Sequence, residues 1–82
     1  MTLAELIRTY VLNEIILPAQ LNNRKFVIVR SGDVHEALCL ENRMPAVCEA
    51  IDSKIFIQQC KIKLVARKGP KLSNTVEWVF EI

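Results

Sequence analysis

The residues in this chain that are best suited to chemistry are one histidine and three cysteines: His35, Cys39, Cys48 and Cys60. His35 and Cys39 are four residues apart, so on a helix they would share a face and could chelate zinc. The other two cysteines are far from this pair, and the sequence has no CxxC pair. The spacing therefore favours a surface histidine with three packed thiols over a metal site, and we expect no metal and no cofactor.

A cysteine nucleophile with a histidine base is the other chemistry that these residues offer. Cys48 and His35 are suitable types, but the sequence provides no third group to orient the imidazole and no oxyanion site. We therefore expect no enzymatic activity and no catalytic residues. The odd number of cysteines, without paired spacing, also argues against a secreted disulfide framework.

The composition is typical of an ordinary globular protein. The 82 residues are 51% hydrophobic and 24% charged, which predicts a single domain, residues 1–82, with one core. No apolar run approaches the ~20 residues needed to cross a bilayer. Glu5 stands where a signal peptide would carry basic residues. We expect a cytoplasmic protein that makes no membrane contact.

The formal net charge is only +2, but it is unevenly distributed. Residues 1–52 contain five Lys and Arg against seven Asp and Glu, whereas residues 53–82 contain six against two. The C-terminal third therefore carries the positive charge, which indicates an edge that faces a polyanion.

The N-terminal segment predicts a helix followed by a strand. Thr2 and Glu5 form a capping box, in which Glu5 reaches back to the Thr2 amide. Pro18 disfavours helical geometry at Leu17, so we expect the helix to end there and residues 18–25 to form a loop. "KFVIVR", residues 25–30, is typical of a strand. The apolar stripe of the helix is Leu3, Leu6, Ile7, Tyr10 and Val11.

Two further helices are expected in the middle of the chain. Ser31 is the predicted N-cap of the first, with Val34, Ala37 and Leu38 as its apolar face. After a tight turn at "LEN", Asn42 is the predicted N-cap of the second, which places Pro45 in the first turn. This second helix is expected from about Arg43 to about Lys54. Its apolar side is Met44, Val47, Ile51 and Ile55.

The last third predicts a β-hairpin with a basic tip. Both strands alternate between apolar and charged residues, and the lysines at 61 and 63 are expected opposite Glu77 and Glu81. "KGPKLSN", residues 68–74, has the chemistry of a turn. The predicted inward residues are Cys60, Ile62, Leu64, Ala66, Val76, Trp78, Phe80 and Ile82.

This order of elements resembles the winged helix-turn-helix fold, an α+β class. "SGDVHEALCL", "EN" and "RMPAVCEAIDSKIF" would form the helix-turn-helix, about residues 31–55. "KIKLVARKGPKLSNTVEWVF" would form the wing, about residues 57–82. The resemblance implies that the second helix lies in the major groove of double-stranded DNA while the wing grips the backbone.

The resemblance also implies a set of contact residues. Arg43 would bind guanine, and Asn42 would pair with adenine if capping does not consume it. Arg67, Lys68 and Lys71 on the wing would contact phosphates. The outward positions of the second helix would be Asn42, Arg43, Ala46, Glu49, Ala50 and Ser53, with Lys54 beside them.

The function implied is that of a transcriptional regulator or an accessory DNA-binding factor. Glu49 and Asp52 would repel phosphates from the same helix, and this favours the alternative interpretation, a winged-helix module that binds protein instead of DNA. The apolar residues Leu12, Ile16 and Leu17 offer surplus surface that predicts a homodimer through the first helix.

Overall fold

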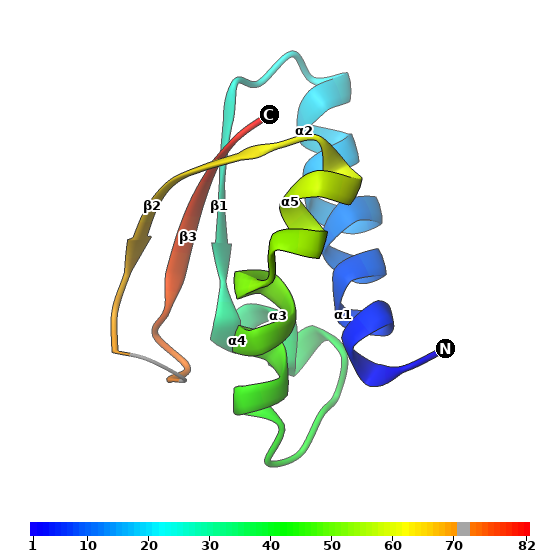
Figure 1. Ribbon diagram of the computed structural model, residues 1–82, viewed down its shortest axis with the longest axis vertical. Coiled ribbons are helices and arrows are strands. Elements are labelled where there is room, and N and C mark those ends of the chain that lie inside the picture. Colours follow the sequence, from blue (N-terminus) through cyan, green and yellow to red (C-terminus); the bar gives the residue numbers. More distant parts are fainter. Residues whose placement is uncertain (71–72) are drawn as a thin grey trace.

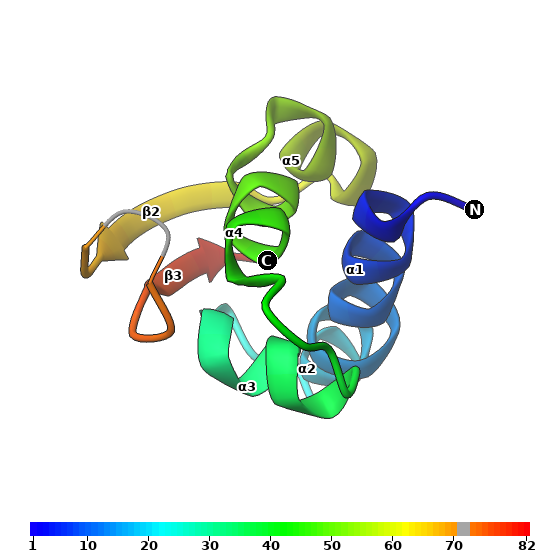
Figure 2. The ribbon, with the colours of Figure 1, turned by 90° about the horizontal axis from the view of Figure 1, so that it is seen from below.

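The computed structural model describes residues 1–70 and 73–82 and has an α+β architecture. The helices lie to one side of a three-stranded antiparallel sheet (Figures 1 and 2). None of the described helices combines the length and apolar character needed to cross a membrane. The elements in chain order are α1 (Leu3–Val11), the π-helical turn η1 (Leu12–Ile16), α2 (Leu17–Leu21), β1 (Phe26–Arg30), α3 (Ser31–Ala37), α4 (Met44–Asp52), α5 (Lys54–Cys60), β2 (Lys63–Lys68) and β3 (Glu77–Glu81).

The predicted cap of α1 is confirmed, with one difference in detail. Thr2 Oγ1 accepts a hydrogen bond from the Glu5 amide at 3.1 Å. The Glu5 carboxylate meets the Thr2 hydroxyl at 3.2 Å, where the sequence predicted the Thr2 amide. Ile7 and Val11 are the fully buried residues of α1.

The predicted end of the first helix at Leu17 is wrong, because the chain stays helical to Leu21. In η1 the Leu17 amide donates to the Leu12 carbonyl, five residues back, and Leu17 keeps helical angles (φ −60°, ψ −44°). This wider turn restarts the hydrogen-bond pattern, so Pro18 falls in the first turn of α2, where its missing N–H removes no intrahelical bond. Ile16 is fully buried as a result and offers no surface for a partner.

The predicted strand near residues 25–30 is confirmed as β1, at one edge of the sheet. The strand order is β1-β3-β2, with β3 antiparallel to both neighbours. The expected inward residues of β3 are also confirmed: Val76, Trp78 and Phe80 are buried. Phe80 packs edge-on against Phe56 of α5, with ring centroids 5.6 Å apart.

The predicted alternation of β2 is only partly confirmed. Ile62 is buried, but Cys60 belongs to α5, and a β-bulge interrupts the register between Leu64 and Ala66. A bulge leaves an extra residue unpaired and breaks the two-residue period. Leu64 and Val65 are therefore both exposed.

The predicted caps of α3 and α4 are wrong. Arg30 occupies the N-cap position of α3, and Ser31 is its first residue. Asn42 has a left-handed backbone (φ 52°), and Arg43 precedes α4 without a side-chain capping bond. Pro45 nevertheless lies in the first turn of α4, as predicted.

The predicted helix from about Arg43 to about Lys54 is confirmed as α4, which ends two residues earlier at Asp52, and a separate helix, α5, begins after a break at Ser53. Ser53 has an extended backbone (ψ 145°), and its hydroxyl accepts from the Phe56 amide at 3.4 Å, capping α5. The change of direction turns Phe56 into the core and leaves Ile55 51% exposed, so the expected place of Ile55 on the apolar stripe is wrong.

Candidate nucleic-acid interface

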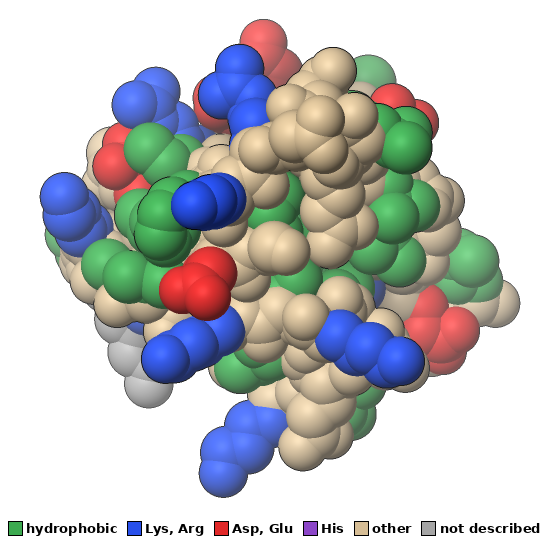
Figure 3. Space-filling view, turned by 90° about the horizontal axis from the view of Figure 1, so that it is seen from above, with side chains coloured by type: hydrophobic (Ala, Val, Ile, Leu, Met, Phe, Trp, Pro, Cys, Tyr) green, Lys and Arg blue, Asp and Glu red, His purple; other side chains and the backbone are tan. Residues whose placement is uncertain are grey.

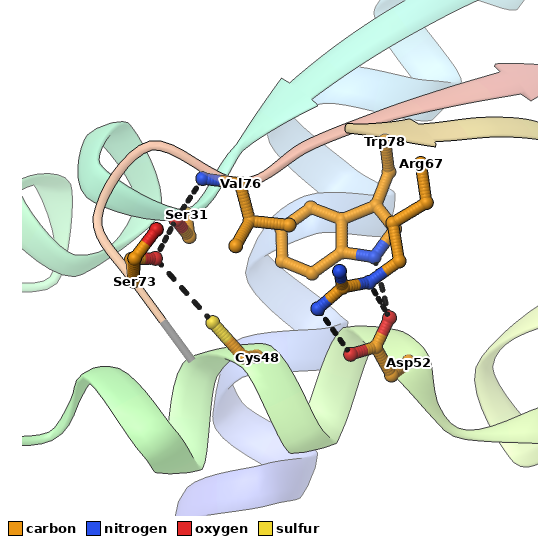
Figure 4. A network of polar contacts seen from close by, with 7 residues as sticks. All are labelled: Ser31, Cys48, Asp52, Arg67, Ser73, Val76 and Trp78. Carbon is orange, nitrogen blue, oxygen red and sulfur yellow. Dashed lines mark hydrogen bonds and ion pairs between the residues drawn. The ribbon is translucent and has the colours of Figure 1, made fainter. Parts of the chain in front are cut away.

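Helix α4 and the β2–β3 hairpin lie side by side, and two polar clusters join them (Figures 1, 2 and 4). One cluster is at the end of α4, where Asp52 meets Arg67 and Trp78. The other is at the base of the hairpin loop, where Ser73 meets Ser31 and Cys48. Together they fix the hairpin relative to the exposed face of α4.

Asp52 accepts three hydrogen bonds from the hairpin (Figure 4). Arg67 donates through Nε to Oδ1 at 2.9 Å and through Nη2 to Oδ2 at 3.1 Å, a bidentate pair. The indole N–H of Trp78 donates to Oδ1 at 2.7 Å. Because Trp78 is fully buried, this bond satisfies a polar group that would otherwise be costly in the core.

The pair with Asp52 changes the roles expected for both charges. The hydrogen bonds that Arg67 donates to Asp52 raise the pKa of Arg67, and the guanidinium also lies 5.7 Å from the centre of the Trp78 ring. Arg67, predicted to bind phosphate, is thus already engaged within the chain. Asp52, predicted to repel DNA, has its charge offset by the same pair.

Ser31 ties the start of α3 to the base of the hairpin loop. Its hydroxyl donates to the Ser73 carbonyl at 2.6 Å and accepts from the Val76 amide at 3.2 Å. The Cys48 thiol also approaches the Ser73 carbonyl, at 3.6 Å. A Cβ on Gly32 would lie 2.7 Å from the Asn74 carbonyl oxygen, so this close approach of two backbones requires glycine.

The three cysteines and the histidine have different surroundings in the fold. Burial, followed by the charge of Asp52, raises the pKa of Cys48, and burial also raises the pKa of Cys60. Both thiols are thereby kept protonated. Cys39 lies beyond the end of α3, so its expected place on one helix face with His35 is wrong. His35 Nε2 instead accepts from the Arg43 amide at 3.2 Å. Within residues 1–70 and 73–82, no group of three or more potential ligands could hold a metal ion.

The residues predicted on α4 fall into exposed and inaccessible positions. Arg43 and Glu49 are exposed, and Ala46 between them is half-buried. Ala50, predicted to point outward, is buried in the core. Asn42 is exposed just before the helix, and its side chain is not used as a cap.

The remaining predicted contacts are placed around this helix. Ser53 is half-buried and donates to the Ala50 carbonyl at 2.9 Å, whereas Lys54 is exposed at the start of α5. Lys68 is exposed at the end of β2, opposite Glu77. Lys71 lies outside the described residues. Lys63 is opposite Glu81, as predicted, but Lys61 ends α5 with a left-handed backbone (φ 54°) and has no place in the ladder.

Positive charge is dispersed on the face of the molecule that Figure 3 shows. At the end of the molecule that holds the C-terminus, Lys and Arg side chains stand apart, with acidic, hydrophobic and other polar groups between them (Figure 3). Arg30 forms an ion pair with Glu77 at 2.7 Å. This end of the molecule therefore presents separate positive charges and not a continuous basic stripe.

Sequence reasoning missed the polar contacts that hold the hairpin to α4. Ser31 was interpreted as a cap and Asp52 as a repulsive charge, although Asp52 and Trp78 are 26 residues apart and bonded. Local spacing carries no signal for such a pair.

In comparisons with protein-family models, with curated proteins and with solved structures, no match to this chain is found.

Proposed function

We propose that the chain is a small non-enzymatic DNA-binding protein of the winged helix-turn-helix type, acting as a transcriptional regulator or an accessory DNA-binding factor. The observation that carries the proposal is the bidentate bond between Asp52 and Arg67. It fixes the hairpin beside α4, whose exposed side includes Arg43 and Glu49. A winged helix requires such a pairing of one helix with one basic hairpin.

The topology supports the same proposal. A helix, a strand, two further helices and a hairpin follow one another, and the early strand β1 pairs with the last strand β3. In this arrangement α4 would enter the major groove, and the tip of the hairpin, about residues 68–74, would lie on the backbone.

Each contact residue then has a distinct role. Arg43 would donate to guanine, and Asn42 would pair with adenine, because its amide is not used in capping. Lys54, Lys68 and Lys71 would contact phosphates and set the register. Arg67 would position the hairpin through Asp52, a change from the phosphate contact expected from sequence. Glu49 would accept from cytosine, while Ala46 and Ser53 would allow close approach.

Selection from a random duplex library, followed by titration of the selected site, tests this proposal. Arg43→Ala should reduce affinity for the selected site by about 1–3 kcal/mol and relax the preference at one base pair. Lys68→Ala with Lys71→Ala should instead weaken binding to all sequences and flatten the salt dependence. If neither variant changes DNA retention, the proposal fails.

A protein-binding module on the same fold is the alternative. The observation that favours it is the exposed carboxylate of Glu49 on α4, in a chain of net charge only +2. If the chain is such a module, no duplex sequence should be enriched from the random library, even at low salt. Arg43→Ala would then weaken capture of a protein partner while having no effect on DNA.

A further inference from the structure

Strand β1 leaves one row of backbone groups unused by the sheet. Two hydrogen bonds flank its ladder with β3: the Ile82 amide donates to Lys25 at 2.8 Å, and the Ser31 amide donates to Val76 at 3.0 Å. Hydrogen bonding alternates along an antiparallel strand, so odd-numbered residues of β1 are bonded to β3. The amides and carbonyls of Phe26, Ile28 and Arg30 therefore point to the open edge.

The side chains beside this edge are apolar and accessible. Phe26 is 52% exposed and Ile28 is 56% exposed, and Val79 of β3 lies opposite Ile28. A groove of about 630 Å³ runs between this edge and the helical segment before it. The groove is lined by Glu14, Ile15, Pro18, Ala19, Asn22, Arg24, Phe26, Val27, Ile28 and Val79.

The edge also lacks the features that keep strands from pairing. Proteins protect edge strands with bulges, prolines and charges, lysine in particular. The register of β1 against β3 is continuous over all five residues, whereas β2, the other edge, carries a bulge and the lysines 63 and 68. Arg30 is the one charge within β1, and Glu77 already pairs with it.

We propose that the β1 edge binds the same edge of a second copy of this chain, joining two three-stranded sheets into one antiparallel sheet about a twofold axis at Ile28. This register matches the free backbone groups of both copies. It places Phe26 opposite Arg30 of the second copy, a pair suited to a cation–π contact. A shift by two residues in one direction would set Arg24 opposite Arg30 of the second copy, where like charges repel. A shift by two residues in the other direction would set Phe26 opposite Gly32, which belongs to α3 and not to the strand.

The charges that flank β1 fit this register. Arg24 and Lys25 precede the strand, and Asp33 lies in the first turn of the helix that follows it. A twofold axis at Ile28 brings the basic end of each copy to the acidic end of the other, so the complementarity occurs twice. The proposal places the dimer interface at the edge of β1. The first-helix surface that the sequence predicted is less suitable, because its residue Ile16 is buried.

Analytical ultracentrifugation of the full chain, between about 10 μM and about 1 mM, tests the proposal over the range suited to a small interface. The wild-type protein should form a dimer as concentration rises. Ile28→Pro should be monomeric throughout, because proline removes the amide at the open edge and no bond to β3. Leu17→Lys is the matched control at the start of α2, where Leu17 is 41% exposed, and should dimerise like wild type.

A charge exchange protects the test against a variant that fails to fold. Arg24→Glu alone and Asp33→Arg alone should each weaken dimerisation, and the double variant should restore it, with folding checked by circular dichroism. A wild-type chain that stays monomeric to the highest concentration overturns the proposal. So does a dimer that Leu17→Lys abolishes, or one that survives both Ile28→Pro and the single charge reversals. The measurement contains no DNA, so its failure leaves the proposed DNA binding untouched.

Discussion

The two edge strands of the sheet differ in their regularity and in their exposed side chains. β2 carries a bulge and two lysines, and its Arg67 is bound to α4 through Asp52. β1 is regular and exposes Phe26 and Ile28 beside an apolar groove. Both strands pair antiparallel with the same central strand, so the contrast comes from the bulge in β2, from their side chains and from their neighbours.

This contrast separates two kinds of surface on one small domain. The bulge and lysines of β2 disfavour pairing with another strand. The bond between Arg67 and Asp52 holds β2 beside α4, so the charges of β2 lie next to the exposed face of that helix. The β1 edge offers backbone groups and apolar area, which suit a protein partner. The proposed DNA contacts and the proposed dimer interface would thus lie on separate edges and would not compete for the same residues.

Truncating Trp78, a buried side chain of the central strand β3, should have the largest effect on stability. Trp78 is fully buried on β3, opposite Val29 of β1 and Arg67 of β2. Trp78→Ala should lower the free energy of unfolding by about 3–5 kcal/mol, through lost packing and a cavity. Urea denaturation followed by circular dichroism measures this. Trp78→Phe, which keeps a ring but loses the N–H bonded to Asp52, should cost clearly less, and an equal cost would contradict a packing role.

Breaking the polar contact of the β2 edge should have an intermediate effect. Asp52→Ala leaves the buried Trp78 N–H without its acceptor and releases Arg67, which should cost about 1–2 kcal/mol of unfolding free energy. Glu49→Ala, an exposed acid on the same helix, is the control and should stay within about 0.5 kcal/mol. Equal losses for the two variants in urea denaturation would mean that Asp52 does not hold the hairpin.

Removing the surface ion pair between Arg30 of β1 and Glu77 of β3 should have the smallest effect. Arg30 and Glu77 meet at 2.7 Å, but their side chains are 58% and 30% exposed. Glu77→Gln should therefore change the unfolding free energy by less than about 1 kcal/mol. A loss in urea denaturation as large as that of Asp52→Ala would remove the energetic distinction between the two edges.

The sequence predicted the elements better than their ends. Periodicity found α1, β1 and the inward face of β3, because each has a regular apolar pattern that local geometry determines. It failed at Pro18 and Ser53, where a π-helical turn and a hydroxyl cap change the path of the chain. It failed again at the bulge of β2, where one extra residue breaks the alternation.

Part of the surface exposure of the predicted contact residues could be predicted from the sequence, but the bonds that they and their neighbours form could not. The exposure of Glu49 follows from its place between apolar residues of α4, and Arg43 and Lys68 are exposed charged residues in polar stretches, so a pattern can find all three. The bond between Asp52 and Arg67 joins residues 15 apart, one at the end of α4 and the other in β2, with α5 between them. Its existence depends on tertiary packing, which spacing alone does not encode.

Titration of a labelled duplex at several salt concentrations tests the central claim, DNA binding by the face of α4 and the hairpin, most directly. We predict binding at about 50 mM salt that weakens as salt rises, with a slope of log K against log salt near −0.9 for each phosphate contact. Lys68→Ala should reduce the magnitude of that slope by the contribution of about one phosphate contact. A protein that leaves the duplex free at about 50 mM salt, or a slope that Lys68→Ala does not change, would contradict the account.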